Sequence, residues 1–316
     1  MEKAVRGVVN DKTVAPGLVR LLFHDCFVRG CDGSVLLVST PTNIAGQTEK
    51  DSPRNDNLRG LDLIQKIRDA ILTMSGGVNI SCADAIVFAA REATFLLSNR
   101  KIAYPIDGPG RNDGINSSVE DPANFLPGST DNFAQLLASF TAKPGFGVTE
   151  LVALSGTHST GLCHGASFAD RLTPDVVNRT EIDFNYQQVI LKERDANPNG
   201  AFLNNIRDMK KSAVKSSHYS ASKVMTAAVG VLDNSFYNAN LQNMVRFKSD
   251  WELRTNKKAF KLMQKYNGDF SVWVTDFSAA MTKLSNTLTS EGPVFEDGFR
   301  KDCTRTNLDS YPPPAV

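Results

Sequence analysis

Three features that mark particular protein classes are missing from this chain of 316 residues. No apolar run reaches the length of about 18 residues that a membrane-spanning helix needs, so no such helix is expected. The formal net charge is only +1, so we expect no basic face of the kind that binds nucleic acid. Strand-like alternation of apolar and polar residues is scarce. What remains is helical periodicity in a composition of 41% hydrophobic and 22% charged residues, which is typical of globular proteins.

Cysteine is sparse, and its count of five is odd. At least one thiol is therefore free if the others pair within the chain. Reduced thiols in a cytosolic protein are one interpretation. Three sequons favour the other, a secreted and glycosylated protein. The sequon asparagines are Asn79, Asn116 and Asn178.

Apolar residues at helical spacing predict a mainly α protein. The expected helices cover residues 14–27, 61–74, 82–97, 131–142, 149–154, 201–215, 256–266 and 271–288. Asp131 is expected to cap the fourth of these helices, and Gly156 is expected to end the fifth. Long irregular connections are expected over residues 38–57, 98–127 and 172–198. Loops of this length in a compact domain usually carry function.

The stretch RLLFHDCFVRGCDGSVLL, from Arg20 to Leu37, has the most unusual composition. Arg20 and His24 are four residues apart, so they share one face of a helix. They are either an exposed arginine beside a structural histidine, or a base and a fixed cation lining a cavity. The second arrangement suits proton removal and the stabilisation of developing negative charge.

The loop after this helix offers hard oxygen ligands from Asp25, Asp32 and Ser34, with glycines that let the backbone turn around an ion. This composition favours calcium. A zinc site built from His24, Cys26 and Cys31 is the alternative, but the spacing is unlike a zinc knuckle.

This stretch resembles the distal haem motif of the secretory plant haem peroxidases (class III). Six further blocks are similar to that family and follow in the same order. They are TEKDSPRNDNLRG (48–60), SCADAIVFAAREA (81–93), GPGRNDG (108–114), LVALSGTHSTG (151–161), LDNSFY (232–237) and SDWEL (249–253). The resemblance covers almost the whole chain. It implies one peroxidase domain over residues 1–316, with haem between a distal lobe (about 1–130) and a proximal lobe (about 131–316).

The resemblance implies an enzyme that binds haem b, reduces hydrogen peroxide to water and oxidises small phenolic donors in one-electron steps. His158 matches the axial haem ligand, and Asp250 matches the carboxylate that supports it. His24 matches the distal base, Arg20 the cation that stabilises the breaking O–O bond, and Asn55 the group that orients His24.

Further residues carry over by the same resemblance. Glu49 matches a residue that supports the distal network, and Pro127 a proline at the haem edge where donors approach. Asp84 and Arg111 match a buried ion pair. The expected calcium ligands are Asp25, Val28, Gly30, Asp32 and Ser34, with the oxygens of Val28 and Gly30 coming from the backbone. Cys26–Cys31 and Cys82–Cys303 match two family disulfides, which leaves Cys163 as a buried free thiol.

The second cation site of the family is degraded in this chain. It would use Ser159 and Asp233, but the two positions that supply an aspartate and a threonine upstream of Asp233 fall on Met225 and Ala228. One carboxylate gives too little charge for tight calcium binding. We therefore expect this site to be weak, empty or filled by a monovalent cation.

Two other functions compete with a secreted peroxidase. A non-enzymatic, calcium-stabilised scaffold of the same fold is opposed by the presence of all the matched catalytic residues. An intracellular ascorbate-type peroxidase is opposed by the paired cysteines. We expect a monomer in the cell wall, apoplast or vacuole, with no nucleic-acid or membrane partner. The first residues lack the apolar centre of a signal peptide, so we expect a leader to have been removed.

Overall fold

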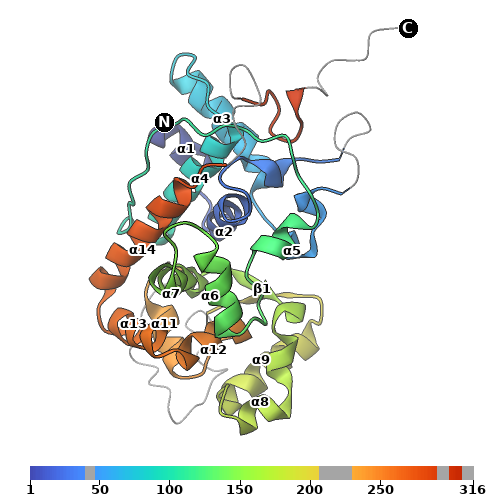
Figure 1. Cartoon of the computed structure of the whole chain (residues 1–316), viewed down its shortest axis with the longest axis vertical. Coiled ribbons are helices and arrows are strands. Elements are labelled where there is room, and N and C mark those ends of the chain that lie inside the picture. The colour runs from blue at the N-terminus through green and yellow to red at the C-terminus, as the bar shows by residue number, and fades with distance from the viewer. Residues whose placement is uncertain (40–46, 206–229, 290–298, 308–316) are drawn as a thin grey trace. The chain divides into compact units, whose positions relative to one another are not determined.

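The computed structural model describes residues 1–39, 47–205, 230–289 and 299–307. The chain divides into two compact units (Figure 1). The first contains residues 1–126 and the described residues from Met281 onward, and the second contains residues 127–280. We expected the proximal lobe to continue to the C-terminus, but the segment from Met281 groups with the first unit.

The first unit is built on helices α1 (Glu2–Val8), α2 (Ala15–Cys26), α3 (Leu61–Met74), α4 (Cys82–Leu97) and α5 (Asp121–Phe125). Helix α4 is rich in alanine and almost wholly buried, so that α2 and α3 pack closely against it. Ser81 caps α4 by accepting a hydrogen bond from the Asp84 backbone N–H. The predicted ion pair is confirmed: Arg111 Nη1 lies 2.7 Å from Asp84 Oδ1, with both side chains buried.

The second unit begins with α6 (Phe133–Thr141) and α7 (Val148–Ser155). It continues with β1 (Leu162–His164), α8 (Pro174–Asn178), α9 (Phe184–Ala196) and β2 (Ala201–Leu203). After the undescribed segment come α11 (Ser235–Leu241), α12 (Lys248–Glu252) and α13 (Lys257–Gly268). The last helix, α14 (Phe270–Ser285), contains the boundary between the units.

Three expectations about this unit were wrong. Of the helix expected over residues 201–215, residues 201–203 instead form strand β2, antiparallel to β1 with Cys163 opposite Phe202, and residues 206–215 lie outside the described part of the chain. The connection over residues 172–198 contains α8 and α9. Their sequences are too polar to show a helical period of apolar residues. Helix α6 is capped by Asn132, whose side chain accepts from the Gln135 backbone N–H, and not by Asp131.

Gly156 follows α7 for a different reason from the one we expected. Its φ of −58° is helical, so it does not end the helix in a left-handed cap. A Cβ atom there would lie 2.7 Å from Trp273 Nε1 and from Tyr237 Oη. These two buried side chains donate hydrogen bonds to carbonyl groups of α7. Only glycine lets the chain pass this close to them, on its way to His158.

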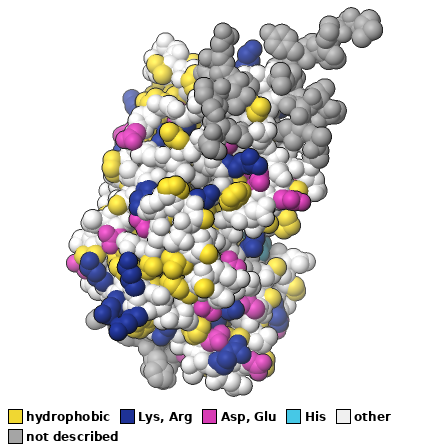
Figure 2. Space-filling model, viewed as in Figure 1, with side chains coloured by type: hydrophobic (Ala, Val, Ile, Leu, Met, Phe, Trp, Pro, Cys, Tyr) yellow, Lys and Arg dark blue, Asp and Glu magenta, His cyan; other side chains and the backbone are white. Residues whose placement is uncertain are grey.

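The surface agrees with the low net charge. On the face shown in Figure 2, Lys and Arg side chains gather at the lower left, near α13, and acidic side chains lie among basic ones elsewhere. The exposed lysines of α13 are Lys257, Lys258, Lys261 and Lys265. Within the described part of the chain, no helix is long and apolar enough to cross a membrane.

Candidate active site

Helix α2 presents Arg20 and His24 on one face, as the spacing predicted. His24 Nδ1 lies 2.6 Å from the side-chain oxygen of Asn55. The Asn55 amide nitrogen donates to the Glu49 carbonyl at 2.7 Å, which fixes the orientation of the amide. Because the Asn55 oxygen can only accept, Nδ1 of His24 must carry the proton. Nε2 is therefore the basic nitrogen.

Arg20 is held beside this nitrogen by three hydrogen bonds. Its Nε donates to His24 Nε2 at 3.1 Å, and its two terminal nitrogens donate to the carbonyl groups of Arg54 and Asp56. Burial and the nearby Arg59 guanidinium lower the pKa of Arg20 to about 10, so it stays cationic at neutral pH. A fixed cation thus adjoins the base.

The charge environment keeps His24 neutral. Burial and the Arg20 guanidinium lower its pKa from 6.5 to about 3, although the bond to Asn55 opposes this shift. An uncharged imidazole whose Nε2 carries no proton can accept one throughout the physiological pH range.

A buried acidic cluster lies next to this network. Asp25, Asp32 and Glu49 are fully buried, and neither carboxylate oxygen of Asp25 or Glu49 has a hydrogen-bond partner within the described residues. Burial and mutual repulsion raise the pKa of Asp25 well above its ordinary value. Burial raises the pKa of Glu49 to about 8. Such groups are costly unless a cation or a proton neutralises them.

The cluster fits calcium better than a transition metal. Within the described residues, no three His, Cys, Asp or Glu side chains are arranged as a metal site. The carboxylates of Asp25 and Asp32 would therefore need hydroxyl and backbone oxygens to complete a ligand set. Ser34 Oγ is buried and has no hydrogen-bond partner in the described part of the chain, and Val28 and Gly30 lie in the same loop. Oxygen-only coordination of this kind is typical of calcium.

His158 belongs to the second unit, in the short turn after α7. Its Nδ1 lies 2.8 Å from Oδ1 of Asp250, a buried carboxylate on α12. The rings of Phe236 and Phe247 pack edge-on against the imidazole. The side chain is nevertheless 40% exposed. An imidazole held by a carboxylate at one nitrogen and accessible otherwise fits the chemistry of an axial haem ligand.

Comparison with known proteins agrees with this pattern. A sequence profile described as peroxidase matches residues 1–269. The chain belongs to the peroxidase family. Peroxidase 47 of Arabidopsis thaliana is 35% identical, over 97% of this chain and 85% of its own length. Peroxidase 2 of Zea mays is 34% identical, over 97% and 83% of the two chains. The resemblance to the class III plant peroxidases, the mainly α fold and the enzyme class are thereby confirmed.

Both disulfides implied by the resemblance are present in this peroxidase. Cys26 is bonded to Cys31, next to the acidic loop, and Cys82 is bonded to Cys303. Cys163 is free and buried. Burial raises the pKa of its thiol to about 12, so it is unreactive as a nucleophile.

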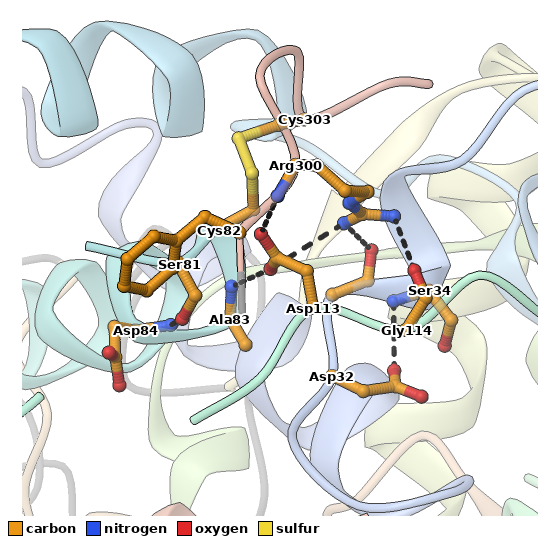
Figure 3. A network of polar contacts seen from close by, with 12 residues as sticks. Asp32, Ser34, Ser81, Cys82, Ala83, Asp84, Asp113, Gly114, Arg300 and Cys303 are labelled. Carbon is orange, nitrogen blue, oxygen red and sulfur yellow. Dashed lines mark hydrogen bonds and ion pairs between the residues drawn. A yellow bond between two sulfur atoms is a disulfide. The ribbon is translucent and has the colours of Figure 1, made fainter. Parts of the chain in front are cut away.

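Sequence reasoning missed two charged residues that hold the acidic loop. Asp113 accepts from the backbone N–H groups of Ala83 and Arg300, and the Arg300 guanidinium donates to the Gly33 carbonyl at 2.7 Å (Figure 3). The Cys82–Cys303 disulfide fixes the same C-terminal segment. The buried Arg300 charge also opposes the rise in the pKa of Asp25. No short motif signals these contacts, because their partners are far apart in sequence.

Other predicted site residues lie as follows. Pro127 is half-buried, two residues after α5, and begins the second unit. The Asp233 backbone N–H donates to Ser159 Oγ, and Asp233 Oδ1 accepts from the Ser235 backbone N–H at the start of α11. Asp233 therefore closes a turn just before α11, whose N-cap residue is Asn234. Met225 and Ala228 lie outside the described residues.

Proposed function

We propose that this peroxidase binds haem b through His158, reduces hydrogen peroxide to water, and oxidises small phenols one electron at a time. Bound haem supplies the redox chemistry, and the protein supplies ligation, proton transfer and electrostatics. The observation that carries the proposal is the fixed tautomer of His24. A base locked with Nε2 unprotonated, beside a cation, suits peroxide chemistry better than any structural role.

The proton steps follow from these positions. Nε2 of His24 accepts a proton from one oxygen of hydrogen peroxide and returns it to the other oxygen, which leaves as water. Arg20 stabilises the negative charge that develops as the O–O bond breaks. Two phenol molecules then each give one electron and one proton, so that the second oxygen also leaves as water. Asn55 holds the tautomer, and Asp250 makes His158 a stronger electron donor.

We further propose calcium at Asp25, Val28, Gly30, Asp32 and Ser34. The repulsion among buried carboxylates supports this assignment, because an ion would remove it. Glu49 supports the same network. For Pro127 we keep the role at the donor entrance that the resemblance implies.

We also propose that this peroxidase is a secreted or vacuolar monomer. Two disulfides favour an oxidising compartment. The three sequon asparagines are exposed, so each is accessible for glycosylation.

Haem loading tests the function directly. The protein loaded with haem should show a Soret band and should oxidise a simple phenol such as guaiacol only when hydrogen peroxide is present. The His158→Ala variant should lose tight haem binding. Tight haem binding without any peroxide-dependent oxidation would instead favour a non-enzymatic scaffold.

A further inference from the structure

Two asparagines directly after β2, Asn204 and Asn205, hold the backbone that carries His158. The Asn204 side-chain nitrogen donates to the His158 carbonyl at 3.2 Å. The Asn205 side-chain nitrogen donates to the Ser159 carbonyl at 3.2 Å and to Ser235 Oγ at 2.9 Å. Asn204 and Asn205 are 8% and 3% exposed, so these bonds are shielded from water.

The orientation of both amides is determined by their partners. A carbonyl oxygen has only lone pairs, so each amide must turn its NH₂ group, and not its oxygen, toward the backbone. The Asn204 backbone N–H also donates to the Gly161 carbonyl, which ties the end of β2 to the turn after His158. Pairing of β2 with β1 sets this register, and it brings the two asparagines to the carbonyl groups of His158 and Ser159.

The side-chain amide of Asn205 is incompatible with a cation bound beside His158. The cation site expected beside His158 would draw on oxygens of Ser159 and Asp233. An N–H group directed at the Ser159 carbonyl puts partial positive charge where a cation would bind. The Ser159 hydroxyl oxygen accepts from the Asp233 backbone N–H, and Asp233 Oδ1 accepts from Ser235. Internal donors thus use three of the oxygens that a cation would need.

We propose that the Asn205 side-chain amide replaces the second cation of this peroxidase, and that Asn204 and Asn205 are positioning residues for His158. The amide links the residue after His158 to the start of α11, as an ion ligated from both segments would do. Asp250 holds the imidazole, and the asparagines hold its backbone. The proposal rests on the proposed role of His158 as haem ligand, and it makes this side of the protein independent of calcium.

The Asn205→Asp variant tests the replacement. It exchanges the NH₂ group for a carboxylate oxygen that faces the Ser159 carbonyl and the hydroxyl of Ser235, two residues after Asp233. Without an ion these oxygens repel one another; with one they form the charged oxygen set that calcium prefers. Metal analysis of the haem-loaded protein after exhaustive dialysis should rise from about one calcium per chain in the natural protein to about two in the variant.

A matched control adds the same charge to the same unit. Asn256 caps α13 with its side-chain oxygen alone, accepting from Lys258 and Ala259, so Asn256→Asp keeps its hydrogen bonds. Its calcium content should equal that of the natural protein. Two tightly held calcium ions in the natural protein, or no gain of calcium in a folded Asn205→Asp variant, would overturn the proposal.

A spectroscopic readout separates positioning from general stability. In the reduced, haem-loaded protein, the iron–histidine stretching band in the Raman spectrum should not change on calcium chelation. In Asn205→Asp it should shift on chelation and return when calcium is added.

A second variant is available if Asn205→Asp fails to fold. At constant calcium, the band of Asn204→Ala should be shifted from its position in the natural protein, and an unchanged band would contradict the proposal. If the natural protein binds no haem, the proposed function fails, whereas the calcium counts still test the role of Asn205.

Discussion

Asn55 determines which nitrogen of His24 can act as a base. The 2.6 Å contact between Asn55 Oδ1 and His24 Nδ1 holds the proton on Nδ1, and the bond from Asn55 to the Glu49 carbonyl prevents the amide from turning round. The catalytic tautomer is thus set by a backbone carbonyl in a short turn. Replacing Asn55 therefore removes the orientation of the base while leaving the base itself in place.

Replacing Asn55 by valine should slow the reaction with hydrogen peroxide on the order of 10-fold, less than the loss of the base itself. The variant loses the acceptor that holds Nδ1–H, and it loses the one contact that raises the pKa of His24. Stopped-flow mixing of haem-loaded protein with peroxide measures the rate. Asn124→Val, at an exposed position of α5, is the control, and an equal loss in both variants would contradict the orienting role.

The pH dependence of the same rate should follow His24. Because its pKa is lowered to about 3, the imidazole is unprotonated above about pH 4, and the rate should be flat there. It should fall as the pH drops through about 3. The unfolded state, with a pKa of 6.5, binds the proton more readily, so the free energy of unfolding should decrease as the pH falls from 6.5 toward 3. A rate that halves near pH 6.5 would show that the surroundings of His24 do not lower its pKa, and it would contradict this prediction.

Calcium binding should release protons near neutral pH. Without the ion, Glu49 titrates at about 8, and the pKa of Asp25 is also raised, so carboxyls of the cluster are protonated at pH 7. Because the pKa of Glu49 is raised, its protonated carboxyl contributes to the stability of the calcium-free form. This contribution is fully present below about pH 4.5 and is lost as the pH rises through about 8.

Calorimetric titration with calcium at pH 7, in buffers of different ionisation enthalpy, should therefore give release of about one proton or more per ion. The stabilisation by calcium should grow with pH over the same interval. Binding at pH 7 without any proton release would mean that the carboxylates are already ionised and that the cluster is not as buried as it is here.

Much of the fold could be predicted because its helices are strongly periodic. The predicted helix over residues 61–74 coincides with α3, and that over 82–97 coincides with α4. Helix α9 was missed because it buries few apolar side chains and is otherwise polar. Strand β2 was mistaken for a helix because three residues gain strand structure only by pairing with β1, a partner that local sequence does not reveal.

The candidate site divides in the same way. Arg20, His24 and the acidic loop lie within one short stretch, so their composition alone suggested chemistry. The contacts of Asn55 with His24, of Asp250 with His158 and of Arg300 with Gly33 join distant segments. The first two were expected only from the family resemblance. Arg300, Asn204 and Asn205 belong to no quoted motif, and their contacts emerged only from the folded chain.

The most direct test of the central claim compares two histidine variants of the haem-loaded protein. His24→Ala should retain its Soret band but react with hydrogen peroxide about 10²–10⁴-fold more slowly, because it lacks the base. His164→Ala, in strand β1 of the other unit, removes a histidine without this role and should react at close to the natural rate. Unchanged peroxide kinetics in His24→Ala, with haem bound, would contradict the account of this chain as a peroxidase that uses His24 as its base.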